Sequence, residues 1–164
     1  MPKKIKIKLY LDTSIPSAYF DYSKPLRQLI TQKWFENEAS KYELFISTIT
    51  IEEIERMENK TRKQSIKDLI LKHNVKVLEQ SEKAIYLASE YTKKGAIPVS
   101  EPEDAHHIAI AAVNGIDALA SWNFKHIVSI NPVRKIHEIN KKLHYKTIEI
   151  GSLEMFGGAN YGNL

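Results

Sequence analysis

The sequence contains no cysteine. This absence excludes a disulfide framework, a zinc site with thiolate ligands, an iron–sulfur cluster and a cysteine nucleophile. Any catalytic or binding chemistry must therefore come from carboxylates, hydroxyls, histidines or lysines.

Long apolar segments are also missing. The longest uninterrupted aliphatic stretch covers residues 108–113, whereas a membrane-spanning helix needs about 20 apolar residues. Near the N-terminus, residues 5–8 alternate between Ile and Lys, unlike the continuous apolar middle of a signal peptide. We therefore expect a cytoplasmic protein with no membrane segment.

Several common motifs have no counterpart in the chain. The sequence has no Gly-x-Gly-x-x-Gly, no P-loop and no Gly-x-Ser-x-Gly, so nothing favours dinucleotide binding, ATP binding or a serine-based triad. An aspartyl phosphatase that uses Asp-x-Asp after its first strand would need an acid at position 14, where the chain has Ser14. That enzyme class is therefore disfavoured.

The composition is typical of one globular domain. Of the 164 residues, 43% are hydrophobic and 27% are charged, and this length suits a single domain with a real core. We predict one domain over residues 1–156 and a flexible C-terminal tail over residues 157–164, which has little to bury. The net charge of +4 is compatible with a polyanionic partner but does not identify one.

The pattern of apolar residues predicts strands that alternate with helices. Period-two alternation and short β-branched runs predict strands at 5–11, 43–47, 75–78, 118–121 and 147–150. Helical spacing and capping residues predict helices at 25–38, 50–57, 62–72, 81–95, 100–114 and 131–143. Strands separated by helices imply an α/β fold with a parallel sheet between layers of helices.

In such sheets the functional site lies beyond the carboxyl ends of the strands, where the strand order reverses. This rule selects Asp12 after the first strand, residues 47–53 with Glu53 after the second, and the region of Asn123 after the fourth. Asp104 lies at the start of the helix before the fourth strand, and we expect the fold to bring it to the same end. Three carboxylates in one cleft repel one another unless a cation is present. Mg²⁺ or Mn²⁺ prefers such oxygen ligands, and it activates water for phosphodiester cleavage in metal-dependent nucleases.

Each acid also has a purely structural interpretation. Asp12 could satisfy the backbone of a turn, Glu53 could form a capping box with Thr50, and Asp104 could oppose a helix dipole. The location of all three at one end of the sheet favours the shared site. A di-iron site built on Asp104 and His107 is disfavoured, because the chain has only one carboxylate-x-x-His segment; we expect one histidine of the pair 106–107 to be packed and the other solvated.

Four segments resemble the motifs of the PIN-domain family, in its order and with its usual intervals, over a match from about residue 5 to residue 150. They are Leu9-Tyr10-Leu11-Asp12-Thr13-Ser14, the run 46–54 (ISTITIEEI), the run 103–111 (EDAHHIAIA) and the run 121–127 (SWNFKHI). The resemblance implies a three-layer fold with a five-stranded parallel sheet and an acidic site that binds Mg²⁺ or Mn²⁺ for RNA cleavage. It also implies homodimers and, for many small members, VapC-like toxins paired with a cognate antitoxin.

Carried over to this chain, the family's acids are Asp12, Glu53 and Asp104, and Thr13 and Ser14 are supporting residues. The fourth position, often Asp in the family, is Asn123 here. Asn brings a carbonyl oxygen without negative charge, so a second metal ion would be held less tightly. Many family members also have Asn at this position and keep a site of three acids.

Contacts to the substrate are assigned to Trp122 and Lys125, which follow the fourth strand and could stack on a base and meet a phosphate. The main hypothesis is a metal-dependent endoribonuclease, either a toxin or a housekeeping nuclease. The alternative, which Asn123 makes plausible, is a catalytically inert PIN-fold module that binds RNA or a protein.

Overall fold

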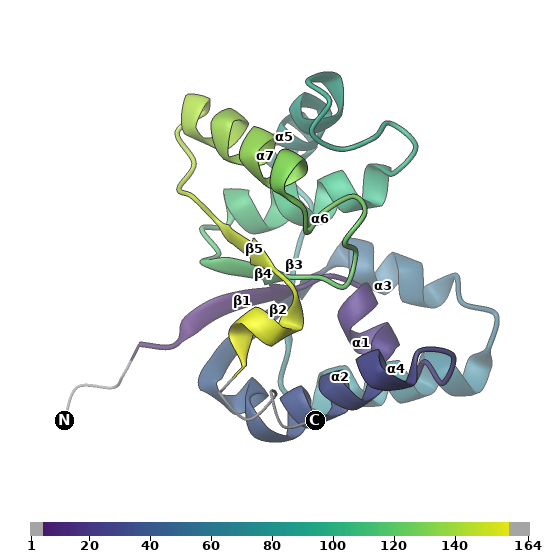
Figure 1. Cartoon of the computed structure of the whole chain (residues 1–164). Coiled ribbons are helices and arrows are strands. Elements are labelled where there is room, and N and C mark those ends of the chain that lie inside the picture. Colours follow the sequence, from purple (N-terminus) through teal and green to yellow (C-terminus); the bar gives the residue numbers. More distant parts are fainter. Residues whose placement is uncertain (1–4, 158–164) are drawn as a thin grey trace.

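The computed structural model describes residues 5–157 and has a five-stranded, all-parallel sheet with the strand order β3-β2-β1-β4-β5 (Figure 1). The predicted α/β fold is confirmed. The strands are β1 (Ile7–Leu11), β2 (Tyr42–Ser47), β3 (Lys76–Leu78), β4 (Ala118–Ala120) and β5 (Glu149–Gly151). Leu9 in the central strand β1 pairs with Leu44 of β2 on one side and with Ala118 of β4 on the other.

Helices cover both faces of the sheet. They are α1 (Ser14–Ala18), α2 (Pro25–Asn37), α3 (Thr48–Glu55), α4 (Lys60–Lys72), α5 (Glu82–Lys93), α6 (Pro102–Val113) and α7 (Ile130–Lys142), with short 3-10 turns η1 (Ala39–Lys41) and η2 (Leu153–Phe156). Figure 1 shows α5, α6 and α7 on one face and α1, α2 and α4 on the other. The three layers agree with the architecture expected for strands joined by helical crossovers.

The core has two halves, one on each face of the sheet, because successive side chains of a strand point to opposite faces. Tyr10 packs with buried residues of α5, α6 and α7, including Ile108. Its neighbours Leu9 and Leu11 pack on the other face with buried residues of α1, α2 and α4, including Trp34.

Two local predictions are wrong. Helix α3 begins at Thr48 and not at Thr50: the Ser47 hydroxyl accepts a hydrogen bond from the backbone N–H of Ile49, and the Thr50 hydroxyl accepts one from the backbone N–H of Ser47. This capping box occupies Thr50, so the capping interpretation of Glu53 is also wrong. Helix α1 was not predicted, because it has only five residues and is too short to show a period.

The end of the described chain packs against the domain. Trp34 Nε1 and the Tyr42 hydroxyl both donate hydrogen bonds to the backbone oxygen of Phe156, at 3.0 and 2.8 Å. The predicted tail at 157–164 lies outside the described residues except for Gly157. Within residues 5–157, no helix has the length and apolar character needed to cross a bilayer.

The strand order reverses between β1 and β4. The chain moves outward from β1 through β2 to β3, and then returns to place β4 on the other side of β1. In open parallel sheets a crevice forms at the carboxyl ends of the two strands where this happens. Asp12 directly follows β1 and Ser121 directly follows β4, so both lie at this crevice.

Candidate active site

Asp12 is a buried carboxylate held by hydroxyl groups at the crevice; its side chain and backbone together are only 3% exposed. Its Oδ1 accepts hydrogen bonds from the backbone N–H of Ser14, at 3.0 Å, and from the Ser14 hydroxyl. Its Oδ2 accepts one from the Ser121 hydroxyl at 2.6 Å. Burial raises the pKa of Asp12, and the nearby His107 and these hydrogen bonds oppose that rise.

The same two hydroxyl groups connect the end of β1 to the end of β4. Ser14 Oγ accepts a hydrogen bond from the backbone N–H of Trp122, and Ser121 Oγ accepts one from the backbone N–H of Asn123, both at 2.9 Å. The orientation of the Asp12 carboxylate is therefore fixed by two segments that lie far apart in the sequence. Sequence reasoning named Ser14 as a supporting residue and missed Ser121.

Asp104 lies in the first turn of α6, which begins at Pro102. Burial is the main cause that raises its pKa, from an ordinary value of 3.8 to about 7, and the charge of Asp12 is the next. The charge of Asp12 therefore disfavours the ionised form of Asp104. Oδ2 of Asp104 accepts a hydrogen bond from the side-chain amide of Asn123 at 3.0 Å.

Glu53 lies on α3 and points into the domain, with a side chain that is 27% exposed. Its Oε1 accepts a hydrogen bond from the Thr13 hydroxyl at 3.1 Å and lies 2.6 Å from Nε2 of His107. Its negative charge also contributes to the raised pKa of Asp104, less than that of Asp12. All three predicted acids thus lie at the same end of the sheet.

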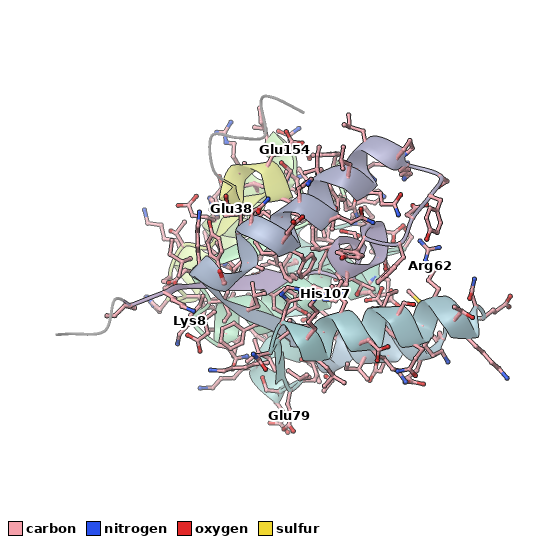
Figure 2. All side chains as sticks on the ribbon, turned by 90° about the horizontal axis from the view of Figure 1, so that it is seen from below. Lys8, Glu38, Arg62, Glu79, His107 and Glu154 are labelled. Carbon is pink, nitrogen blue, oxygen red and sulfur yellow. The ribbon has the colours of Figure 1, made fainter. Side chains whose placement is uncertain are left out.

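His107 is a central residue of the site that sequence reasoning did not assign to it. It is 2% exposed, and Figure 2 shows it in the middle of the molecule. Its Nδ1 lies 2.6 Å from the hydroxyl of Tyr10. A usable signal was present, since His107 follows Asp104 by three residues and so shares its face of the helix. The expectation of one packed histidine holds for His107, whereas His106 is half-buried beside Gln80.

The carboxylate oxygens of the site are the kind of ligand that a hard divalent cation binds, although the side chains are not arranged around a single ion position. Within residues 5–157, no group of three or more His, Asp or Glu side chains is arranged to hold a single metal ion. Burial, however, raises the pKa values of both Asp12 and Asp104, and repulsion by the charge of Asp12 raises that of Asp104 further. A divalent cation would remove that repulsion, and carboxylate oxygens are the ligands that Mg²⁺ and Mn²⁺ prefer.

A basic and aromatic groove of about 470 Å³ begins beside the acids. It is lined by Ser14, Ser17, Ala18, Asp21, Lys24, Arg27, Trp122, Asn123, Phe124 and Lys125. The guanidinium of Arg27 lies 5.2 Å from the ring centre of Trp122 and 5.7 Å from that of Phe124. Trp122 is only 5% exposed and donates through Nε1 to the Thr31 hydroxyl, whereas Phe124 is 46% exposed. Sequence reasoning missed Phe124 and Arg27.

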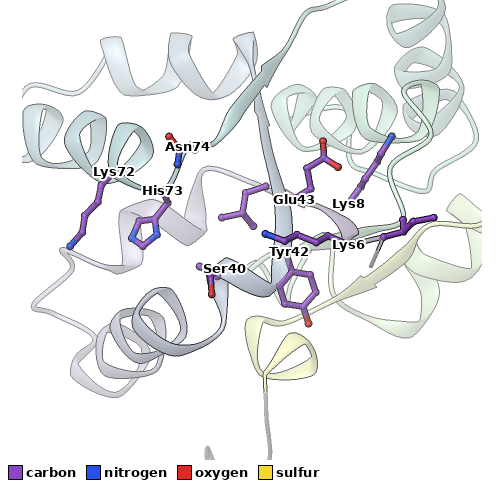
Figure 3. Close-up of a pocket in the computed structure, with 11 residues that line it drawn as sticks. Lys6, Lys8, Ser40, Tyr42, Glu43, Lys72, His73 and Asn74 are labelled. Atoms are coloured by element: carbon purple, nitrogen blue, oxygen red, sulfur yellow. The ribbon is translucent and has the colours of Figure 1, made fainter. Parts of the chain in front are cut away.

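A larger hollow, of about 620 Å³, lies at the opposite end of the sheet (Figure 3). Lys8 and Glu43 at the beginnings of β1 and β2 line it together with His73 after α4. Its one carboxylate, Glu43, lies 2.6 Å from the ammonium of Lys76. This hollow contains no pair of close carboxylates, so the candidate active site is the crevice around Asp12.

The fold and the site define an α/β protein with an acidic crevice at the carboxyl edge of a parallel sheet. The chain belongs to the PIN-domain family: the model described as PIN domain matches residues 9–124. The resemblance that the four motifs indicate is thereby confirmed. No curated protein matches the sequence significantly.

Three solved structures share the fold. VapBC2 from Rickettsia felis, bound to a DNA fragment from its promoter, is 16% identical with a TM-score of 0.52, over 88% of this chain and 97% of that chain. VapC20 from Mycobacterium tuberculosis, a toxin that cleaves the sarcin-ricin loop, is 13% identical with a TM-score of 0.54, over 72% and 92%. DNA-bound VapBC from Salmonella typhimurium is 19% identical with a TM-score of 0.56, over 90% and 98%.

Proposed function

We propose that this protein is a metal-dependent endoribonuclease that hydrolyses RNA phosphodiesters. The observation that carries the proposal is the placement of Asp12 and Asp104 at the reversal of the strand order, where hydrogen bonds of Ser121 and Asn123 link the two carboxylates. Membership of the PIN-domain family supports the same conclusion.

Asp12, Glu53 and Asp104 would hold Mg²⁺ or Mn²⁺. Such an ion supplies positive charge to the phosphoryl group and activates water for attack on phosphorus. The protein contributes orientation, because Ser14 and Ser121 fix the carboxylate of Asp12. Thr13 supports Glu53 by donating to its Oε1.

With Asn123 at the fourth position, the site has three acids, Asp12, Glu53 and Asp104, and one neutral amide. Its Nδ2 donates to Asp104, and its Oδ1 accepts a hydrogen bond from the backbone N–H of His126 at 2.9 Å. The amide therefore holds Asp104 in place without adding negative charge. A site with this charge binds one divalent ion more readily than two, since each further ion needs its own carboxylates.

The groove beside the acids would bind the RNA strand. Phe124 offers an exposed ring on which a base stacks, and Arg27, Lys24 and Lys125 offer cations for phosphates. Trp122 contributes the buried wall that supports Arg27 and Phe124. Of the two contacts assigned from the sequence, Lys125 keeps the role of a direct contact and Trp122 takes a supporting one.

We further propose that the protein is the toxin of a toxin–antitoxin pair, acts in the cytoplasm, and forms a homodimer. The support is the shared fold with VapC20 and with two VapBC complexes. A neighbouring reading frame that encodes a small antitoxin, and growth arrest that its product relieves, would favour the toxin over a housekeeping nuclease. Light scattering of the purified protein measures the oligomeric state.

The second candidate function is a catalytically inert PIN-fold module that binds RNA or a protein. Asn123 favours it, because the site lacks the charge of a fourth acid. Cleavage assays on structured and single-stranded RNAs in Mg²⁺, Mn²⁺ or EDTA separate the two candidates. Metal-dependent cuts that disappear in Asp12→Asn support the nuclease, whereas RNA binding without cuts and without metal binding supports the inert module.

A further inference from the structure

We propose that His107 is a positioning residue that aims the carboxylate of Glu53 at the metal ion, and that Tyr10 anchors His107 in that role. The inference rests on the proposed function, since it concerns the same metal site. It assigns a role to two buried polar residues that the reaction itself does not use.

Both nitrogens of the His107 ring have a partner at short distance. Nε2 lies 2.6 Å from Oε1 of Glu53, and Nδ1 lies 2.6 Å from the Tyr10 hydroxyl, which in turn lies 2.7 Å from Oγ of Ser47. Tyr10, Glu53 and Ser47 come from three different elements, β1, α3 and the end of β2. Because the ring is fixed at both nitrogens, it can hold a neighbour in one place.

The chemistry of the partners fixes the proton on the ring. An ionised Glu53 carboxylate only accepts hydrogen bonds, so Nε2 must carry the hydrogen and donate to Oε1. The other nitrogen, Nδ1, lies against the Tyr10 hydroxyl, which donates its own hydrogen to Oγ of Ser47. Tyr10 is completely buried and its ring meets the His107 ring edge to face, at 5.6 Å between centres. The orientation of the His107 ring is thus set by Tyr10 on one side and by Glu53 on the other.

The contacts of His107 leave one carboxylate oxygen of Glu53 available to a metal ion. His107 and the Thr13 hydroxyl both contact Oε1, whereas Oε2 has no hydrogen bond among the residues that the structure describes. One oxygen is held from two sides, and the other is left for a cation. Groups that orient a metal ligand in this way typically change metal affinity 10- to 100-fold when they are removed.

The test is Mn²⁺ binding to the RNA-free protein, followed by calorimetry. His107→Leu keeps the apolar volume but removes both ring nitrogens, and we expect the Mn²⁺ dissociation constant to rise about tenfold. His107→Gln keeps an N–H donor at the position of Nε2, so it should recover most of that loss. Tyr10→Phe keeps the ring and removes only the hydroxyl, with an expected rise of a few-fold.

A double-mutant cycle shows whether His107 acts through Glu53. In a Glu53→Gln background, His107→Leu should change the Mn²⁺ dissociation constant by less than about twofold. Equal effects of His107→Leu with and without Glu53→Gln would overturn the inference. His73→Leu, at the opposite end of the sheet, is the matched control and should leave Mn²⁺ binding unchanged.

The failure of this inference is distinguishable from the failure of the proposed function. If the wild-type protein binds Mn²⁺ and cuts RNA but His107→Leu and Tyr10→Phe bind Mn²⁺ like the wild type, only the inference is wrong. If the wild-type protein neither binds Mn²⁺ nor cuts RNA, the proposed function is wrong, and so is the proposed role of His107 in metal binding. Near-UV circular dichroism identifies any variant that has lost its packing, and Tyr10→Phe, which changes a single atom, then decides the outcome.

Discussion

The side-chain amide of Asn123 donates a hydrogen bond to Oδ2 of Asp104 at a distance of 3.0 Å. Asp104 also experiences the negative charge of Asp12, which together with burial raises its pKa to about 7. A neutral donor at position 123 thus stabilises the ionised form of Asp104, whereas a carboxylate there would repel it. The charge of residue 123 therefore affects both the ionisation of Asp104 and the stability of the protein without a metal ion.

The variant Asn123→Asp tests this effect of the charge at residue 123. At pH 8 it replaces a donor with a third negative charge near Asp104, so we expect the melting temperature in EDTA to fall by about 3–6 °C. Saturating Mn²⁺ should recover more stability in this variant than in the wild type, because the cation offsets the added charge. Scanning calorimetry with EDTA or Mn²⁺ measures both effects.

The control for this variant is Asn131→Asp, which adds the same charge at an exposed position of α7. It should keep or slightly raise the melting temperature, since an acid in the first turn of a helix interacts favourably with the helix dipole. An unchanged melting temperature for Asn123→Asp in EDTA would show that residue 123 does not control the charge of the site.

The raised pKa of Asp104 predicts how the metal-free protein responds to pH. The unfolded chain releases this proton near 3.8, and the folded protein releases it near 7. Between these values the folded state binds more protons, so the free energy of unfolding falls as the pH rises from about 4 to about 7. Denaturant titrations in EDTA should show this decline, and Asp104→Asn should reduce it. A wild-type free energy that rises over this range, with no difference from Asp104→Asn, is the contrary result.

The same group predicts the pH dependence of metal binding. A cation competes with the proton on Asp104, so Mn²⁺ affinity should rise as the pH increases toward 7 and level off above it. Calorimetry in buffers of different ionisation enthalpy should detect about one proton released per ion at pH 6. Binding that is independent of pH between 5.5 and 8 would mean that Asp104 is not a ligand.

The groove predicts a preference for unpaired RNA. Phe124→Ala removes an exposed aromatic ring, and we expect it to weaken single-stranded RNA binding by about 1–3 kcal/mol while duplex binding changes little. Fluorescence anisotropy with the two RNA forms measures the difference. Leu71→Ala, an exposed apolar residue on α4, is the control. An equal loss of affinity for single-stranded and duplex RNA would show that no base stacks on Phe124.

Arg27 should act on phosphate and not on the base. Arg27→Gln should weaken binding to all single-stranded sequences to a similar degree and reduce the slope of log K against log salt by about 0.7, the effect of one lost phosphate contact. Anisotropy titrations between 50 and 300 mM salt give that slope. A slope equal to that of the wild type would remove Arg27 from the phosphate contacts.

The sequence predicts well whatever depends on local pattern. Alternation around Leu9 and helical spacing around Ile108 report which face of an element is buried. The rule for parallel sheets then places Asp12 at the carboxyl edge of the sheet, where the structure also has it. Asp104 lies at the same edge, as expected for the start of the helix before the fourth strand. A short helix such as α1 cannot be predicted in this way, because its five residues are too few to show the helical spacing of apolar side chains.

The polar partners inside the core were not predictable in the same way. Tyr10 and His107 are 97 positions apart, and Asp12 and Ser121 are 109 apart. Alternation places Tyr10 on the same face of its strand as Lys6 and Lys8, and it leaves open which histidine of the pair 106–107 is packed. It also does not show which polar atom each side chain meets. Those pairings depend on the register of β1 with β4 and on the placement of α6, which only the fold supplies.

The most direct test of the account is RNA cleavage by the wild type, Asp12→Asn and Asp68→Asn in Mg²⁺, Mn²⁺ or EDTA. Asp12→Asn removes the charge of the best-fixed carboxylate of the site, and Asp68→Asn makes the same change at an exposed position of α4. We expect metal-dependent cuts by the wild type and Asp68→Asn, and a loss of at least about 100-fold in Asp12→Asn. Cleavage at the wild-type rate by purified Asp12→Asn, or undiminished cleavage in EDTA, would contradict this expectation.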